Sequence, residues 1–471
     1  MSPLAPRPPG GPAALPGDGG SDRRPRPRPL VPRAYRFPKP ERVTLENGLR
    51  LLVSTRPQLP LVSLLVGVEV GASADPPGAE GLAYMTARLL SEGAGSRTAA
   101  EVAEEAEQLG ATLEANASWD LTAIRLATVG SNLDAALALV ADVAFRPRFD
   151  PAEVQRETSQ RLAEIVSDRD NPRHVAAERG ARFVYGAHRY GAQLAGDETS
   201  IQRLSAERLR AFHGERHRAD ASFLVLVGDV TPERGAELAR RHLGPWPAGA
   251  PPRVPTPEPE PLGPTVICLV DQPGAAQSEI RVSQPGVPRT DPDYFRLLVM
   301  NAVLGEAFGS RLYFNLREKH GYTYGVSSYF SMRRGRGPFV AGAGVHTPVT
   351  DKAVAEFLRE LRDICRVPPT RRELRDAKGF LAGGLAVELQ SNGSVADRIA
   401  EGEMYGLPDD YMHAYRDRIY AVTAEEVQAA AGRVLRPENM VVTVVGDAAE
   451  VQAKLAALRP TQVFDALGNP K

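Results

Sequence analysis

The pair His213 and His217 has the spacing of a zinc site. Both lie in FHGERH on a predicted helix, and residues four apart on a helix face the same side, so two imidazoles there could bind one ion. Glu215, between them, would point to another side, and no third ligand can be identified. Zinc sites use at least three protein ligands. We therefore interpret the pair as the solvated end of a helix and not as a metal site.

The segment from Leu316 to Ser328, LREKHGYTYGVSS, combines a cation with aromatic side chains. Its first part is typical of the last turn of a helix, with Arg317 at the negative end of the helix dipole and Gly321 as a left-handed cap. Its second part alternates like a strand, which would place Tyr322 and Tyr324 on one face. Taken alone, the arginine is a helix-end cation and the tyrosines are strand aromatics. A catalytic role for them needs further support.

Two predicted helices carry a third group of polar residues. Residues 81–93, GLAYMTARLLSEG, have apolar side chains at the three-and-four spacing of one helical face, and Tyr84 and Arg88 share a neighbouring face one turn apart. Glu157 and Glu164 are seven residues apart, so they lie on one face of a second helix. A solvated helix face explains these glutamates as well as a functional role does.

Composition limits the class of protein. The chain has 471 residues, which suggests two to four domains, and its 57 Lys and Arg nearly balance its 58 Asp and Glu. This balance predicts neither nucleic acid nor an anionic membrane as a partner. No apolar run is long enough to span a membrane. Cys268 and Cys365 lack metal-ligand spacing, so we expect both to pack in the core without a disulfide framework.

Proline-rich segments divide the chain. Residues 1–39 are dense in Pro, Gly and Arg, so we expect a disordered tail. This start is not a signal peptide, which predicts a cytoplasmic location for the sequence as written and a periplasmic one if the start codon is misassigned. Residues 247–264, PAGAPPRVPTPEPEPLGP, predict a stiff extended linker. It separates domains predicted at residues 40–246 and 265–460, and residues 461–471 form a second tail.

The two predicted domains contain the same motifs in the same order. Residues 204–229, ending in FLVLVGD, align without a gap with residues 422–447, ending in MVVTVVGD. Each copy predicts a capped helix, a loop and an apolar strand closed by Gly-Asp. Earlier, EGAGSR at Glu92 is similar to EAFGSR at Glu306. The chain is therefore predicted to be a tandem duplication of one α+β domain, and a cleft between two such domains is a usual place for a ligand.

This ordered set of motifs resembles the pitrilysin/insulinase family of zinc metallopeptidases, which includes the mitochondrial processing peptidase and bacterial two-chain relatives. The second half carries DQPGAAQSEIRVSQPGVPRTDPDYF, GSRLYFNLREKHGYTYGVSS and VVTVVGD, and the first half adds VTLENGLRLLV, GLAYMTARLLSEG and YGAHRYGAQLAGDETSI. The resemblance covers about residues 40–460. It implies two homologous domains, each a mixed, largely antiparallel sheet packed with helices, that form half of a clamshell. It also implies a zinc site in the first domain and a substrate-binding Arg and Tyr in the second.

The chain departs from this family at the zinc motif. Where active members have H-x-x-E-H, this sequence has Tyr84-Met85-Thr86-Ala87-Arg88, so both histidine ligands and the general base are missing. Glu157 and Glu164 match the family's downstream glutamate pair, with Glu164 at the position of the third ligand. One carboxylate cannot hold a catalytic zinc ion, so we predict no cofactor on this chain. We also predict that Arg88 pairs with Glu164 and supplies a fixed positive charge in place of zinc.

Arg317 and Tyr324, in contrast, match the pair that contacts the scissile peptide in active members. A guanidinium can hold carbonyl oxygens, and a phenol can donate to the oxyanion formed during peptide cleavage. In the two-chain relatives, one subunit carries H-x-x-E-H and the other supplies Arg and Tyr. We therefore predict the non-zinc subunit of a heterodimeric peptidase, which acts on short unstructured polypeptides with a homologous zinc-bearing partner.

Two alternatives to this prediction stay open. One is a structural or peptide-holding pseudoenzyme, like the core subunits of the respiratory bc complex. The other is an independent peptidase with different zinc ligands. Loss of the zinc motif fits the heterodimer and the pseudoenzyme equally, and retention of both Arg317 and Tyr324 favours the heterodimer.

Overall fold

The structure, a computed structural model, describes residues 37–252 and 254–471. Residues 37–471 form one compact unit. The predicted N-terminal tail falls almost entirely outside the described residues. No helix in the described part of the chain is both long and apolar enough to cross a membrane.

The N-terminal half of the unit, residues 37–246, is built on a six-stranded mixed sheet with the order β1-β2-β6-β3-β5-β4. Only β2 and β6 pair in parallel, and the other neighbours are antiparallel. The sequence SFLVLVG of β6 is buried along its whole length, as expected for a central strand covered on both faces. The strands are β1 (Glu41–Thr44), β2 (Arg50–Thr55), β3 (Leu61–Val68), β4 (Leu113–Ala117), β5 (Thr122–Val129) and β6 (Ser222–Gly228).

The helices of this half begin at residues that favour helix starts. Three of them begin with proline, which suits the first helical turn because its missing N–H would have no partner there. Thr98 and Asp197 form capping boxes at two others. The α-helices are α1 (Leu82–Leu89), α2 (Ala99–Gln108), α3 (Leu133–Phe145), α4 (Pro151–Asp168), α5 (Pro172–Tyr185), α6 (Glu198–Gln202), α7 (Ala206–Arg216) and α8 (Pro232–Leu243). Short 3-10 helices are η1 (Ala72–Ala74), η2 (Gly130–Asn132), η3 (Arg189–Gly191) and η4 (Ala219–Ala221).

The C-terminal half, residues 265–471, repeats the same topology. Its sheet has the order β12-β7-β11-β8-β10-β9, so the strands β7 to β11 follow each other as β2 to β6 do. The outer strands differ, because β12 pairs in parallel with β7 and β1 pairs antiparallel with β2. Residues 461–464, expected in a tail, form its outer strand. The strands are β7 (Val266–Asp271), β8 (Gln277–Pro285), β9 (Val326–Phe330), β10 (Pro338–His346), β11 (Val441–Gly446) and β12 (Thr461–Phe464).

The helices of the C-terminal half include two π-helical segments, η5 (Ala302–Glu306) and η6 (Tyr313–Lys319), and one 3-10 helix, η7 (Thr347–Val349). Thr370 and Thr423 form capping boxes. The α-helices are α9 (Tyr294–Asn301), α10 (Thr350–Arg366), α11 (Arg371–Glu388), α12 (Asn392–Met404), α13 (Tyr415–Ala421), α14 (Ala424–Val434) and α15 (Ala448–Ala456).

The aligned motifs occupy equivalent places in the two sheets. Helix α7 leads into β6, and helix α14 leads into β11, with Ser205 and Thr423 as the respective N-caps. Both strands are central and lie beside the first strand of the repeat. The predicted duplication and the predicted largely antiparallel α+β fold are therefore confirmed.

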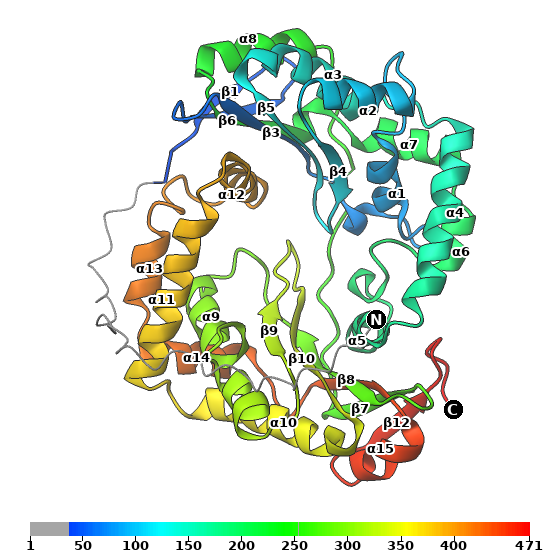
Figure 1. The fold of residues 1–471 in the computed structure, drawn as a ribbon, viewed down its shortest axis with the longest axis vertical. Helices are drawn as coiled ribbons and strands as arrows, with labels where there is room; N and C mark the ends of the chain where they lie inside the picture. The colour runs from blue at the N-terminus through cyan, green and yellow to red at the C-terminus, as the bar shows by residue number, and fades with distance from the viewer. Residues whose placement is uncertain (1–36, 253) are drawn as a thin grey trace, which may run out of the picture. The chain divides into compact units, whose positions relative to one another are not determined.

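Each half contributes one helix that packs on the sheet of the other half. Helix α5 packs on β8 and β11 of the C-terminal sheet, and helix α12 packs on β3 and β6 of the N-terminal sheet. Figure 1 shows α12 on the face of its sheet opposite to α3 and α8, and α5 opposite to α10. A buried cluster accordingly joins Ala176 and Val184 of α5 to Val270 and Val445 of the C-terminal strands. Residues 247–252 and 254–264 between the halves form neither helix nor strand.

Candidate functional site

Helix α1 presents the residues at the altered zinc motif. Asp75 holds the start of this helix, because its carboxylate accepts hydrogen bonds from the backbone N–H groups of Gly81 (2.9 Å) and Ala83 (2.8 Å). The apolar face predicted from the sequence is buried in the core. The neighbouring face of α1 packs on α4, which places the motif opposite the two predicted glutamates.

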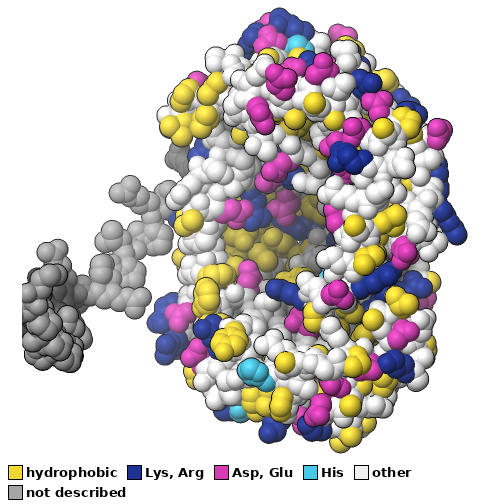
Figure 2. All heavy atoms as spheres, turned by 45° about the vertical axis from the view of Figure 1, so that its right-hand side comes forward, with side chains coloured by type: hydrophobic (Ala, Val, Ile, Leu, Met, Phe, Trp, Pro, Cys, Tyr) yellow, Lys and Arg dark blue, Asp and Glu magenta, His cyan; other side chains and the backbone are white. Residues whose placement is uncertain are grey.

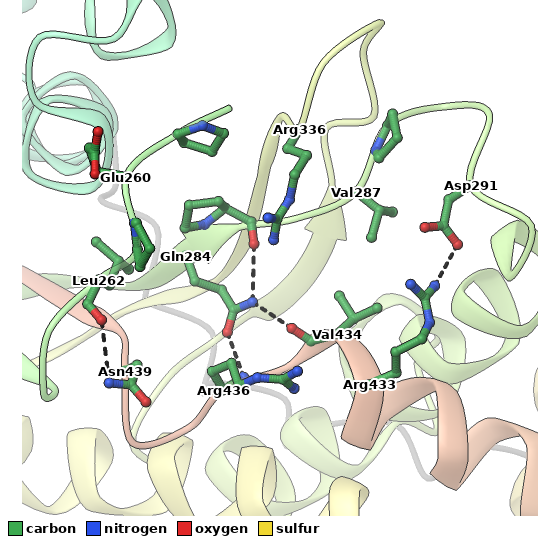
Figure 3. Close-up of a pocket in the computed structure, with 14 residues that line it drawn as sticks. Glu260, Leu262, Gln284, Val287, Asp291, Arg336, Arg433, Val434, Arg436 and Asn439 are labelled. Carbon is green, nitrogen blue, oxygen red and sulfur yellow. Dashed lines mark hydrogen bonds and ion pairs between the residues drawn. The ribbon is translucent and has the colours of Figure 1, made fainter. Parts of the chain in front are cut away.

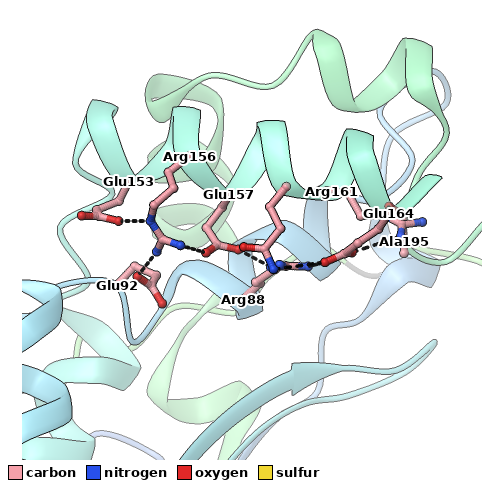
Figure 4. A network of polar contacts seen from close by, with 9 residues as sticks. Arg88, Glu92, Glu153, Arg156, Glu157, Arg161, Glu164 and Ala195 are labelled. Carbon is pink, nitrogen blue, oxygen red and sulfur yellow. Dashed lines mark hydrogen bonds and ion pairs between the residues drawn. The ribbon is translucent and has the colours of Figure 1, made fainter. Parts of the chain in front are cut away.

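Arg88 bridges both glutamates of α4 (Figure 4). Its Nη1 donates to Glu164 at 3.0 Å, and its Nε donates to Glu157. The predicted contact between Arg88 and Glu164 is therefore confirmed. Glu157 is buried, so its interpretation as part of a solvated helix face is wrong. The negative charge of its carboxylate is instead balanced by Arg88 and Arg156.

Two more arginines of α4 extend this network, and they were not singled out from the sequence. Arg156 Nη1 lies 2.6 Å from the Glu157 carboxylate, and Arg156 also contacts Glu92. Arg161 is buried, donates to the backbone oxygen of Ala195 at 3.2 Å, and lies 3.3 Å from the Glu164 carboxylate. Alternation of acidic and basic residues at three-and-four spacing along α4 was the available signal.

The network shifts the ionisation of its members. Burial by itself would lower the pKa of Arg88, but the hydrogen bonds and charges of Glu157 and Glu164 outweigh burial and raise that pKa above its usual range. Burial would likewise raise the pKa of Glu164, but the Arg88 and Arg161 guanidinium groups hold it below its ordinary value. Arg88 and Glu164 therefore form a charged pair near neutral pH.

These residues do not fit the zinc ion that the resemblance implies. The three motif positions provide a phenol at Tyr84, a methyl group at Ala87 and a guanidinium at Arg88, none of which is among the Cys, His, Asp and Glu side chains that hold zinc. The Arg161 guanidinium lies over the Tyr84 ring, 5.8 Å from its centroid, and adds a second positive charge. Among residues 37–252 and 254–471, no group of three or more His, Cys, Asp and Glu side chains could hold a metal ion.

His213 and His217 do not form the solvated helix end that was predicted from the sequence. Both side chains are buried, and their rings lie 4.4 Å apart between centroids. Burial lowers the pKa of His213 to about 4 and that of His217 well below its ordinary value, so both are neutral at pH 7. His213 Nε2 lies 3.0 Å from the Ala144 carbonyl oxygen. The pair is part of the core.

The cysteines differ from each other in burial. Cys268 is buried in the C-terminal core, as predicted. Cys365 is only half-buried at the end of α10, where its thiol donates to the Leu361 carbonyl oxygen at 3.2 Å. Both thiols are free, and burial raises the pKa of each.

Arg317 and Tyr324 lie close together at the surface of the C-terminal half. Arg317 leaves the π-helical segment η6, and its Nη1 donates to the backbone oxygen of Tyr324 at 2.9 Å. The guanidinium also lies over the Tyr313 ring, 4.9 Å from its centroid. Tyr324 as a whole residue is 82% exposed, and the side chain of Arg317 is 41% exposed. The structure thus brings the two predicted residues together and leaves both accessible.

The backbone around this pair differs in one respect from the prediction. Gly321 has the predicted left-handed conformation, with φ of 65°. Strand β9 begins only at Val326, however, so Tyr322 and Tyr324 precede the strand and do not alternate along it. Thr323 explains the irregular segment, because its hydroxyl donates to the Gly344 carbonyl oxygen at 2.7 Å. At this point a side-chain hydrogen bond replaces the regular backbone hydrogen bonds of a sheet.

Pockets and hollows occur elsewhere on the unit. Figure 2 shows a hollowed face in which hydrophobic side chains are flanked by basic and acidic ones. A cavity of about 640 Å³ lies between the linker and the C-terminal half, where Gln284, Arg336, Arg433 and Arg436 line it (Figure 3). None of the predicted site residues lines that cavity.

Comparisons with known proteins agree with this fold. Residues 50–198 match the family described as Insulinase (Peptidase family M16), and residues 203–381 match the domain described as Peptidase M16 inactive domain. The chain belongs to the insulinase family of peptidases, M16. The resemblance inferred from the sequence is therefore confirmed.

Individual M16 proteins match over most of their length. An uncharacterized zinc protease of Mycobacterium bovis is 28% identical over 418 residues, which cover 87% of this chain and 94% of the relative. A probable mitochondrial-processing peptidase subunit beta of Schizosaccharomyces pombe is 24% identical over 438 residues, covering 87% and 92%. The crystal structure of a peptidase M16 inactive domain from Pseudomonas fluorescens superposes with a TM-score of 0.82 at 28% identity, covering 87% of this chain and 98% of that one.

Proposed function

We propose that this chain is the non-zinc subunit of a two-subunit M16 peptidase. In this proposal it supplies Arg317 and Tyr324 to a short unstructured polypeptide, which is cleaved at the zinc site of a homologous partner. The observation that carries the proposal is the contrast between two sites. At the altered zinc motif, Arg88 is held in ion pairs with Glu157 and Glu164, whereas Arg317 and Tyr324 lie together and exposed.

Arg317 has donors to spare for a substrate. A guanidinium has five N–H groups, and one of them is used on the Tyr324 backbone oxygen. Its nearest carboxylate is that of Glu318, at 3.7 Å on the exposed surface, where an ion pair contributes little. The Tyr313 ring on one side limits the directions that the guanidinium can take. The remaining donors can hold the carbonyl oxygens of an extended peptide.

Tyr324 would act on the same peptide. Its phenol can donate a hydrogen bond to an oxyanion, and such donors are most effective when they are fixed before the reaction. The bond from Arg317 to the Tyr324 backbone oxygen links the two residues directly. This bond uses a backbone oxygen, so it remains when the Tyr324 side chain is replaced.

Arg88 would have a structural task in this proposal. A zinc ion would bring positive charge to the carboxylates of α4, and the Arg88 guanidinium supplies charge there instead. The contact between α1 and α4 is then kept without a metal. This chain would cleave nothing by itself, because Ala87 cannot accept a proton from water.

The test is peptide cleavage by this chain, by an M16 homologue that carries H-x-x-E-H, and by their mixture, with the zinc content of each measured. We expect cleavage to appear or rise strongly only in the mixture. Tyr324→Phe should lower kcat by roughly 10²-fold, the effect of losing one oxyanion donor. Arg317→Ala should mainly raise KM. Arg372→Ala, at an exposed position on α11, is the matched control and should change neither value.

No gain on mixing would contradict this proposal. If the chain still bound unstructured peptides without cleavage, the alternative of a peptide-holding pseudoenzyme would replace it. Zinc bound stoichiometrically to this chain would contradict both.

A further inference from the structure

The loop between β9 and β10, residues 331–337, carries three arginines and inserts into the N-terminal half. Its sequence is SMRRGRG. The Arg333 guanidinium lies against two aromatic rings of that half, 4.3 Å from the Trp119 centroid and 4.4 Å from the Tyr190 centroid. These two rings meet edge to face, 5.1 Å apart between centroids. Cation–π contacts of this kind are strongest where water is excluded.

The Trp119 and Tyr190 rings form a binding site for the Arg333 side chain. Nε and Nη1 of Arg333 are buried and make no hydrogen bond in the described part of the chain. The aromatic faces therefore have to offset the loss of hydration that the charge suffers on burial. Lysine would not replace arginine well here, because its ammonium is more strongly hydrated and cannot stack.

Neighbouring backbone groups of the loop are also fixed by the N-terminal half. The Arg334 N–H donates to Asp120 at 2.9 Å, and the Gly335 N–H donates to the Tyr190 hydroxyl at 3.2 Å. The Tyr185 hydroxyl donates to the Arg336 carbonyl oxygen at 2.8 Å. Gly335 has no room for a side chain, since a Cβ there would lie 2.5 Å from Thr256. Three successive residues are thus held by side chains of the other half.

Strand β9 depends on this loop for its position. Within the described part of the chain it is the edge strand of the C-terminal sheet and pairs only with β10, from Val326 opposite Ala343 to Phe330 opposite Phe339. Residues 322–325, with Tyr324 among them, precede β9 directly. The loop follows at the other end of the strand. As an edge strand, β9 is held by its pairing with β10 and by the segments at its two ends.

We infer that Arg333 is a positioning residue for Arg317 and Tyr324: it fixes the β9–β10 loop to the N-terminal half, and thereby holds β9 and the segment that carries Tyr324. This inference rests on the proposed function only for its catalytic consequence. The mechanical part concerns the chain alone.

The mechanical part is tested by hydrogen exchange in Arg333→Ala, Arg333→Lys and Arg372→Ala. We expect the amides of residues 322–330 to exchange about tenfold faster in Arg333→Ala, with a smaller effect in Arg333→Lys and none in Arg372→Ala. The chain has two tryptophans, and Trp246 is buried, so acrylamide quenching reports mainly on Trp119. Quenching should increase in Arg333→Ala. Unchanged exchange at 322–330 with unchanged far-UV circular dichroism would overturn the inference.

The catalytic part uses the mixture with the zinc-bearing partner. Small displacements of catalytic groups reduce rates strongly, so kcat should fall about tenfold in Arg333→Ala at an unchanged affinity for the partner. Faster exchange with an unchanged kcat would overturn the positioning role. If the wild-type mixture cleaves nothing, the proposed function is refuted, and the exchange rates still decide whether Arg333 fixes the Tyr324 segment.

Discussion

Replacement of Arg88 by methionine tests most directly the interpretation that Arg88 supplies positive charge in place of zinc at the altered motif. The side chain of Arg88 is 20% exposed, and it contacts one carboxylate that is almost fully buried, Glu157. Removing one member of a buried ion pair usually destabilises a protein by about 3–5 kcal/mol, because the other charge is left without a partner. Methionine keeps an apolar stem of similar length, so lost packing contributes little to the effect.

The neighbouring arginines reduce this value. Without Arg88, Glu157 keeps Arg156 at 2.6 Å, and Glu164 keeps Arg161 at 3.3 Å. We therefore expect Arg88→Met to lower the free energy of unfolding by about 2–3 kcal/mol, below the full value for a broken buried pair. Urea unfolding followed by far-UV circular dichroism measures this change. Arg241→Met is the control, because that arginine pairs with carboxylates at the surface and should contribute less than about 1 kcal/mol.

A second variant separates lost charge balance from lost contacts. Glu157→Gln removes the buried charge that Arg88→Met leaves with Arg156 alone, so the double variant should be more stable than the sum of the two single effects predicts. A coupling of about 1–2 kcal/mol is expected for such a pair. Unfolding of Arg88→Met at the wild-type urea concentration, or strictly additive effects, would refute the idea that the arginine replaces zinc as the local positive charge.

Three further predictions concern pH, metal binding and the repeated helix start. His213 has a folded-state pKa of about 4, below its ordinary value of 6.5, so the unfolded chain binds more protons than the folded chain between these two pH values. The free energy of unfolding therefore falls as pH decreases through this window, and the loss approaches about 3 kcal/mol near pH 4. Thermal melts of His213→Gln and wild type at pH 7 and pH 4.5 should show a smaller acid effect in the variant. The triple change Tyr84→His, Ala87→Glu and Arg88→His should create a zinc site with Glu164, seen as one zinc per chain by atomic absorption, whereas zinc at the wild-type level would show that α1 and α4 lack the required geometry. Thr423→Ala removes the capping box of α14 and should destabilise the protein by about 1 kcal/mol, which chemical denaturation can resolve; an effect below about 0.3 kcal/mol would mean that burial alone fixes this helix.

The fold was predictable because the chain contains it twice. The gapless alignment of residues 204–229 with 422–447 identified equivalent helices and strands, and both copies adopt them with hydroxyl N-caps at Ser205 and Thr423. Local patterns of this kind are read directly from residue order. The exchange of α5 and α12 between the halves could not be inferred in this way, because it depends on which apolar faces meet in three dimensions.

The site was predictable to different degrees. The contact of Arg88 with Glu164 followed from the resemblance, because Arg88 stands where a histidine ligand would face the third ligand position at Glu164. Burial of His213 and His217 was missed, since a polar pair at a helix end gives no sign of the core around it. The irregular backbone at Tyr322 and Tyr324 was missed because the Thr323 hydroxyl bonds to a residue of another strand. Long-range contacts decided both cases.

The packing of α12 on the N-terminal sheet has a consequence for synthesis on the ribosome. All six strands of that sheet have emerged once Gly228 has left the exit tunnel, but the helix that covers β3 and β6 begins only at Asn392. Until then the nascent chain exposes an apolar sheet face, the kind of surface that chaperones bind. The first half therefore completes its folding only after most of the second half has been translated, and residues 37–246 on their own would make an aggregation-prone fragment.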